Sequence, residues 1–269
     1  MYNQIIMKEI CHKGLAKLVG VYGSNPMNKK DLFELIEASI EPDVENRKNI
    51  EKNLHIIPKV VPILFDWLGK HTIGAKEMAI LNLRKAYNAH LKDDQSWIRF
   101  LGWTLHYITD WGTPYHSPIS VANPVIPKTI IGGMGMGLLG IIANRKRGSK
   151  KMLEGAAKWG LVGTAVSGGS SLINLYLEHN IFEEQCDEFW DRYESIIIRE
   201  FTSQKEILHL PRYFEEAIEK FEEKMNELRI ICNKTSPNWI LSNGGKNFAD
   251  YMIQIAEVMD FAIQIINYY

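Results

Sequence analysis

The sequence predicts an all-α protein, and three of its features support this fold class. Apolar residues recur at helical spacing along nearly the whole chain, whereas runs with the alternating pattern of a β-strand are scarce. Residues typical of helix starts and helix ends separate the periodic segments. The chain has 269 residues, of which 46% are hydrophobic, so it can bury a sizeable core without disulfide bonds. We therefore expect a single compact multi-helix domain over residues 1–269.

Taken in chain order, a series of segments is expected to be helical, and local signals mark several of their ends. Asn3 or a neighbour is suited to cap the first helix, and Asp94 precedes a clear helix start. Pro211 is expected in the first turn of its helix, a common place for proline. Gly244 and Gly245 mark the entry to the last helix. The expected helices span residues 4–20, 30–40, 45–69, 72–92, 95–112, 172–203, 211–232 and 244–267.

Global composition excludes some classes of function. The net charge of −1 gives no indication of an electrostatic nucleic-acid binder. The three cysteines are far apart and form no CxxC motif, so reduced thiols in the core are expected. The N-terminal segment lacks the pattern of a signal peptide, which predicts a cytoplasmic protein.

Residues 118–171 differ in composition from the rest of the chain. They are rich in Gly, Pro and small apolar residues, and the apolar run 129–143 is shorter than the roughly 20 residues that a spanning helix needs. Between residues 144 and 158, six basic residues accompany one acid, Glu154. We expect an insertion that contacts the membrane surface, with an ordinary helical hairpin and a solvated basic loop as the alternative. The predicted membrane-contacting residues are Arg145, Lys146, Arg147, Lys150 and Lys151.

Two pairs of histidine and carboxylate at helical spacing carry the strongest chemical signal. In LHYITDWGTPYHSP, residues 105–118, His106 and Asp110 are four apart and so leave the same helix face. A glycine and a proline then break the helix, and His116 follows in the turn, within reach of that face.

The second pair is found in LEHNIFEEQ, residues 177–185, where His179 and Glu183 are again four apart. Imidazole nitrogen and carboxylate oxygen are the usual ligands of zinc in hydrolytic sites. Each pair alone occurs often by chance, whereas the combination is far more specific. Two such pairs on neighbouring helices can surround two or three ions; the alternative is buried polar pairs that satisfy each other.

The segment 105–118 resembles the signature of the zinc-dependent phospholipase C family at every metal-binding position and at the proline. The fungal single-strand nucleases share that fold and site. The resemblance implies an all-α domain of this type that holds two or three Zn²⁺ ions. By position, His106 and Asp110 resemble ligands of a first zinc, and Asp110 also resembles a bridge to a third. His116, His179 and Glu183 resemble the ligands of a second zinc.

The family also has an aspartate followed by a histidine upstream of this motif. EPDVENRKNIEKNLH, residues 41–55, supplies Asp43 and His55. By resemblance, His55 would complete the first zinc site, and Asp43 would be either a ligand or the general base. His12 resembles the histidine that binds the third zinc. The remaining histidines fit no ligand pattern and are expected at the surface or in hydrogen bonds of the core: His71, His90 and His209.

The chain departs from the family at three places. Secreted members begin with a tryptophan whose amine and carbonyl close the third zinc site, but no tryptophan precedes His12. The processed N-terminus or a carboxylate such as Glu9 could replace it, or the site could be lost. The gap between His116 and His179 is much longer than in the secreted enzymes, and Val44 stands where an aromatic residue would suit a choline headgroup.

The function implied is hydrolysis of a phosphodiester by zinc-activated water, as in a phospholipase C that acts on phospholipid headgroups. Asp43 would orient or deprotonate the water. Peripheral membrane association is expected from the insertion, and no obligate protein partner is evident. The alternatives are a single-strand nuclease or nucleotidase of the same fold, and a non-catalytic zinc-stabilised binding protein.

Overall fold

The computed structural model describes residues 9–44, 70–71, 74–116, 178–204 and 210–269. In these ranges the regular secondary structure is helical and no β-strand is present, which confirms the all-α fold class. Several predicted features lie outside the described residues: the cap at Asn3, the expected helix at 45–69 with His55, the insertion at 118–171 with the basic residues assigned to it, and His209. None of the described helices is long and apolar enough to cross a membrane.

The observed helices follow the predicted ones closely in position. Residues 178–203 are also helical and fall within the helix predicted at 172–203. Within the described ranges, 3₁₀ turns are found at η2 (Pro114–His116) and η4 (Asn243–Gly245). The α-helices with both ends described are α1 (Ile10–Tyr22), α2 (Lys29–Ala38), α5 (Ala75–His90), α6 (Ser96–Gly112), α9 (Phe214–Lys234), α10 (Pro237–Ile240) and α11 (Lys246–Tyr268).

Local chemistry explains the starts of two helices, α6 and α11. The side chain of Asp94 accepts a hydrogen bond from the backbone N–H of Ser96 at 3.0 Å, as expected for the residue that leads α6. Gly244 and Gly245 both have positive φ, 58° and 82°, so they form the turn into α11 that other residues rarely adopt.

The prediction for Pro211 was wrong, because α9 begins only at Phe214. The hydroxyl of Tyr269, at the other end of the chain, donates to the carbonyl of Pro211. Tyr213 is extended, with φ −113° and ψ 141°. A tertiary contact thus holds the segment before α9 in a non-helical conformation, which local propensity does not reveal.

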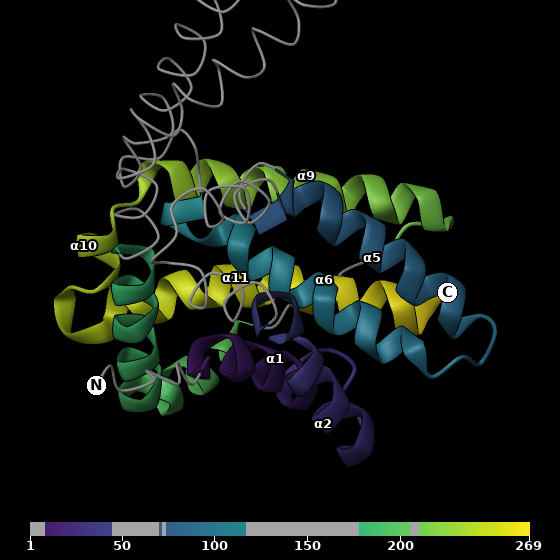
Figure 1. Ribbon diagram of the computed structural model, residues 1–269, viewed down its shortest axis with the longest axis horizontal. Helices are drawn as coiled ribbons and strands as arrows, with labels where there is room; N and C mark the ends of the chain where they lie inside the picture. The colour runs from purple at the N-terminus through teal and green to yellow at the C-terminus, as the bar shows by residue number, and fades with distance from the viewer. Residues whose placement is uncertain (1–8, 45–69, 72–73, 117–177, 205–209) are drawn as a thin grey trace, which may run out of the picture.

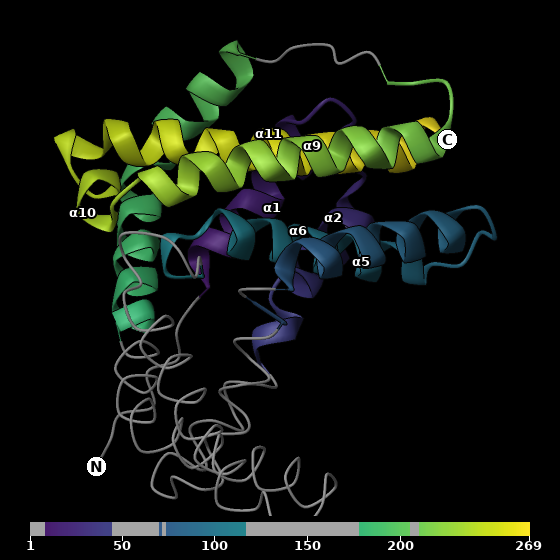
Figure 2. The ribbon, with the colours of Figure 1, turned by 90° about the horizontal axis from the view of Figure 1, so that it is seen from above.

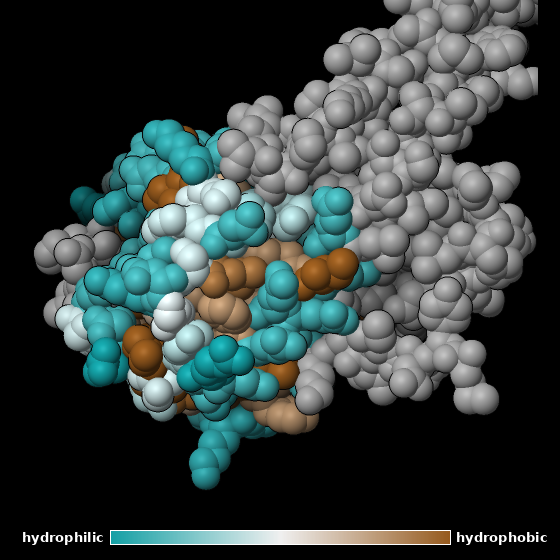
Figure 3. Space-filling model, turned by 90° about the vertical axis from the view of Figure 1, so that its left-hand side faces the viewer, coloured by the Kyte–Doolittle hydropathy of each residue, from teal (hydrophilic) through white to brown (hydrophobic). Residues whose placement is uncertain are grey.

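Helix α6 lies at the centre of the bundle. It packs against α1, α2, α5, α9 and α11, most extensively against α5 (Figure 1). In Figure 2, α9 and α11 run side by side as one layer over α5 and α6. The helix of residues 178–203 crosses one end of the bundle in both views. That end has a largely hydrophilic surface with a few small apolar areas (Figure 3).

A close approach between α2 and α6 depends on Gly102. A Cβ atom at this position would lie 2.5 Å from the Cβ of Ala38 and 3.1 Å from the carbonyl oxygen of Leu35. Because part of that contact is backbone, α2 could not yield by rotating a side chain. The glycine therefore fixes the distance between the two helices, and with it the position of Ser39, which follows α2 directly.

Replacing Gly102 with Ala should therefore reduce stability by about 1–3 kcal/mol through overpacking, even though alanine favours a helix by about 1 kcal/mol. Gly20→Ala is a matched control, because its added Cβ would meet the flexible end of Leu32 at 2.6 Å. Urea unfolding of both variants measures the difference. Equal stability of the two variants would contradict the proposed constraint.

Candidate metal centre

The centre is built around a buried pair on the last turns of α6. His106 and Asp110 are 0% and 1% exposed, and His106 Nε2 lies 3.2 Å from Asp110 Oδ2. The other ring nitrogen, Nδ1, lies 3.0 Å from the carbonyl oxygen of Ser39. That carbonyl can only accept, so Nδ1 carries the proton and Nε2 faces the carboxylate. The spacing of α2 and α6 thus sets the orientation of this histidine.

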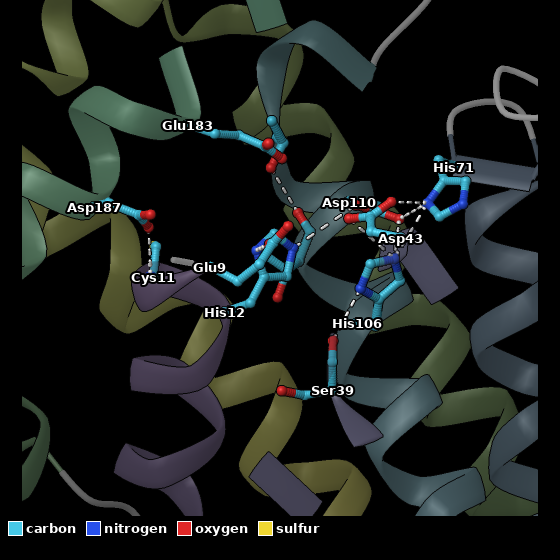
Figure 4. A network of polar contacts seen from close by, with 12 residues as sticks. Glu9, Cys11, His12, Ser39, Asp43, His71, His106, Asp110, Glu183 and Asp187 are labelled. Carbon is cyan, nitrogen blue, oxygen red and sulfur yellow. Dashed lines mark hydrogen bonds and ion pairs between the residues drawn. The ribbon is translucent and has the colours of Figure 1, made fainter. Parts of the chain in front are cut away.

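Two further side chains complete a first group around this pair. His71 Nδ1 lies 2.8 Å from Asp110 Oδ2 and 3.2 Å from His106 Nε2. Asp43 Oδ1 lies 3.5 Å from His71 Nδ1, and its Oδ2 lies 3.8 Å from His106 Nε2. Figure 4 shows these four side chains converging from α6 and from two segments distant in sequence. His71, His106 and Asp110 could share one metal ion, and Asp43 could share one with His106 and with His12 of α1.

A second group forms where η2 meets the helix of residues 178–203. The Nε2 atoms of His116 and His179 are in direct contact, and His179 Nε2 lies 3.2 Å from Glu183 Oε1. His116 Nδ1 lies 2.7 Å from the carbonyl oxygen of His71, to which it donates. Its Nε2 is therefore the nitrogen that is available toward His179. These three residues also lie close enough together to hold one ion.

The helix that carries Glu183 is attached to the start of α1. The backbone N–H of Cys11 donates to Asp187 Oδ1 at 2.8 Å, and Lys17 pairs with Glu194 at 3.1 Å. These contacts place Glu183 opposite the first turn of α1. Glu9, His12 and Glu183 accordingly line one cavity, with a volume of about 30 Å³.

The two groups adjoin each other through Asp110 and His116. Asp110 Oδ1 lies 3.4 Å from His116 Nδ1, while its Oδ2 faces His71 and His106. Each oxygen of this carboxylate thus faces a different side of the centre. A carboxylate in this arrangement can link neighbouring metal ions.

His12 approaches the same carboxylate from α1. Its Nε2 lies 3.9 Å from Asp110 Oδ1, and its ring stacks on His106 with centroids 5.2 Å apart. This Nε2 is buried and has no hydrogen-bond partner among the described residues. A buried polar atom without a partner is costly, and a metal ion beside it would remove that cost.

Burial and charge act in opposite directions on the histidines. Burial alone would lower the pKa of His106, but the Asp110 and Asp43 carboxylates outweigh it and raise the pKa to about 9. For His116 burial prevails over the attraction of Asp110, and its pKa falls to about 4. Burial would raise the pKa of Asp110, but the neighbouring histidines, His106 first, hold it well below the ordinary value.

The donor set fits a bound metal ion. Buried imidazole nitrogens and carboxylate oxygens dominate the centre, and the Nε2 atoms of His116 and His179 face each other, as two ligands of one ion do. The unpartnered Nε2 of His12 points to the same conclusion. These groups of histidine and carboxylate could therefore hold metal ions.

The structure brings together every predicted ligand that it describes. They come from α1, the segment after α2, α6, η2 and the 178–203 helix, and they are His12, Asp43, His106, Asp110, His116, His179 and Glu183. The remaining predicted ligand, His55, lies outside the described residues.

His71 is the residue that sequence reasoning missed. It was assigned to the surface or to a hydrogen bond of the core, yet it lies fully buried among the ligands. It stands further from Asp43 in sequence than the expected spacing, so the pattern directed attention to His55 instead. The one available signal was its place between the two predicted helices at 45–69 and 72–92.

Comparisons of the chain with family models, with curated proteins and with solved structures found no match in any of the three. The geometry of the centre and the sequence motif are therefore the basis of the functional argument.

The metal-free protein should be most stable near pH 6.5, the ordinary pKa of histidine. His106 has a raised pKa, so its contribution is present below pH 6.5 and is lost as the pH rises toward 9. His116 has a lowered pKa, so the unfolded state binds more protons between pH 4 and 6.5, and stability falls as the pH falls through that range. Each limb is limited to about 1.4 kcal/mol per pH unit and proton.

Urea unfolding in the presence of EDTA between pH 4.5 and 9 measures this profile. His106→Gln should flatten the alkaline limb and His116→Gln the acid limb, whereas His90→Gln, outside the centre, should change neither. Stability that rises steadily from pH 6.5 to 9 would be inconsistent with the buried histidine–carboxylate arrangement.

Proposed function

We propose that the protein is a zinc-dependent phosphodiester hydrolase, and specifically a phospholipase C that acts on phospholipid headgroups. The observation that carries this proposal is the adjacency of two buried histidine–carboxylate groups that meet at Asp110 and His116. Neighbouring zinc ions in such a centre, when bound, polarise phosphoryl oxygens, neutralise charge on the phosphorus and lower the pKa of water.

The residues divide into two sets by their contacts. Asp43, His71, His106 and Asp110 would hold one ion, because each has a ligand atom within 3.8 Å of another member. The second set, His116, His179 and Glu183, would hold the other ion. Asp110 presents its second oxygen toward His116 and His12, so it would fix the spacing between ions.

With three divalent ions bound, the charges of the centre would favour an anionic substrate. Among the described residues it contains four carboxylates, those of Glu9, Asp43, Asp110 and Glu183, and five histidines that are neutral when they act as ligands. Two divalent ions would balance the carboxylates, and a third would leave an excess of positive charge. A centre with this balance attracts a phosphodiester and stabilises the charge that develops on it.

Asp43 is the candidate general base. Its carboxylate is the more peripheral of the two in the first group, at 3.5 Å and 3.8 Å from its nearest histidine nitrogens, whereas Asp110 approaches His71 to 2.8 Å. A carboxylate at the edge of the group can orient an attacking water and accept its proton. The position also suits a direct ligand, and the two roles differ in their effect on metal content.

The segment between the two sets supports a lipid substrate. His116 and His179 both lie in the centre, so residues 117–177 leave from it and return to it. In sequence this segment combines apolar runs with a basic stretch, a composition suited to anionic lipid surfaces. A single-strand nuclease would instead hydrolyse nucleic acid, and a non-catalytic zinc protein would hydrolyse neither.

Metal analysis combined with activity assays tests the proposal. Purified protein should contain zinc, and it should release phosphorylated headgroups from phosphatidylcholine or phosphatidylethanolamine vesicles. Hydrolysis of single-stranded DNA without hydrolysis of lipid would favour the nuclease. Bound zinc with no hydrolysis of a lipid, a nucleic acid or a soluble phosphodiester would favour the binding protein.

Asp110→Asn should reduce both zinc content and turnover, the latter by more than about 100-fold, because the carboxylate contacts both sides of the centre. Asp43→Asn should retain more zinc and lose turnover if Asp43 is the base; loss of zinc would make it a ligand. Asp260→Asn is the matched control, since Asp260 is also buried but accepts hydrogen bonds from Ser24 instead. Full activity of Asp110→Asn would refute the proposed centre.

Shortening residues 118–171 should weaken binding to anionic vesicles while sparing hydrolysis of a soluble phosphodiester. Each basic residue near an anionic surface contributes about 1 kcal/mol, so the loss should be greatest at low salt. Vesicle sedimentation at two salt concentrations measures it. The membrane role should be abandoned if the shortened protein binds anionic vesicles as well as the intact one.

A further inference from the structure

Glu9 immediately precedes α1, and its backbone conformation and burial are unusual for a residue at the start of a helix. Its backbone is left-handed, with φ 48° and ψ 35°, which is uncommon for a residue with a side chain. Its side chain makes no capping hydrogen bond to the helix, the usual task at this position. The residue is nevertheless only 7% exposed. A buried carboxylate on an unfavourable backbone conformation is more typical of a functional site than of a helix start.

The carboxylate of Glu9 is directed at the imidazole of His12, one turn later. Glu9 Oε2 lies 3.4 Å from His12 Nδ1. The opposite ring nitrogen, Nε2, lies 3.9 Å from Asp110 Oδ1 and has no hydrogen-bond partner among the described residues. Figure 4 shows the His12 ring beside Glu9, on the opposite side of Asp110 from His71. The three groups thus follow one another as carboxylate, imidazole and carboxylate.

The other oriented histidines of the centre suggest what this arrangement does. Nδ1 of His106 and Nδ1 of His116 each donate to a backbone carbonyl, which leaves Nε2 of each toward the ligands. At His12, the Glu9 carboxylate lies at the corresponding nitrogen, with Oε2 3.4 Å from Nδ1. A carboxylate at the far nitrogen fixes the tautomer and ring orientation and makes the near nitrogen a stronger ligand.

We infer that Glu9 is a positioning residue that holds His12 with its unprotonated Nε2 toward a metal ion shared with Asp110. The inference rests on the proposed metal centre and adds a role for a residue that is not itself required as a ligand. It also accounts for the left-handed backbone, because this conformation accompanies a side chain that is turned from the helix end toward the ring. The cavity beside Glu9 and His12 leaves room for water next to such an ion.

Zinc-binding isotherms test this role. Metal-free protein is dialysed against buffers of graded free zinc, and bound zinc is measured by elemental analysis. In Glu9→Gly, one ion should require roughly 10- to 100-fold more free zinc, and the remaining ions should bind as in the wild type. His12→Ala should lose the same ion. In Glu9→Gln the shift should be smaller, because the amide oxygen still accepts from Nδ1.

Two controls separate positioning from folding. Glu37→Gln removes a carboxylate that pairs with Lys13 on the same face of the fold, and it should leave zinc binding unchanged. Glycine is well suited to a φ of 48°, so metal-free Glu9→Gly should remain folded, as judged by urea unfolding. The ¹¹³Cd spectrum of cadmium-loaded Glu9→Gly should change at the one resonance that His12→Ala also affects.

Four outcomes would overturn the inference. Glu9→Gly could bind its full complement of zinc ions at the free zinc concentrations that suffice for the wild type. It could also lose all of its zinc ions in parallel, and this second outcome would indicate a purely structural role. Equal losses in Glu9→Gln and Glu9→Gly would show that the carboxylate is itself a ligand. If the wild type binds no zinc, the proposed function fails together with this inference. If the wild type binds zinc and hydrolyses its substrate, and Glu9→Gly binds zinc equally well, the role of Glu9 alone fails.

Discussion

Burial of the Asp110 carboxylate is the constraint on which the arrangement of the helices depends. A charged carboxylate that is 1% exposed loses its hydration, at a cost of several kcal/mol unless the protein replaces it. Here the replacement comes from imidazole nitrogens within 2.8–3.9 Å, supplied by α1, α6, η2 and the segment before α5. Helix α1 and η2, which both contact α6, therefore also compensate this charge, so packing and electrostatics cannot vary independently there.

The histidines around this carboxylate differ in how readily they bind a proton. His106 is held in its charged form over a wide pH range, whereas burial keeps His116 neutral. Without metal, protons and hydrogen bonds to the carboxylates balance the charges only in part, and the Nε2 of His12 makes no hydrogen bond among the described residues. Binding of divalent ions would displace protons and supply positive charge where the carboxylates converge. The same residues that limit the stability of the metal-free protein thus favour occupation by metal.

Backbone carbonyl groups from different parts of the fold orient the ligand histidines. The carbonyls of Ser39 and His71 each accept from the Nδ1 of one histidine, and their own positions depend on how α2 and the start of α5 approach α6. The end of α6 is held in turn, because Trp111 donates to the carbonyl of Met225 at 2.6 Å and Tyr251 donates to that of Gly112 at 2.5 Å. Small shifts between helices would therefore change ligand geometry directly.

Periodicity and spacing in the sequence were enough to predict the all-α class, most helix positions and the pairs His106–Asp110 and His179–Glu183. These features depend on the local geometry of a helix, where residues four apart share one face. The sequence did not indicate His71 as part of the centre, the extended segment at Pro211 or the direction of the Glu9 side chain. Each of these depends on contacts between residues distant along the chain, and only the packing of helices around α6 decides which of them meet.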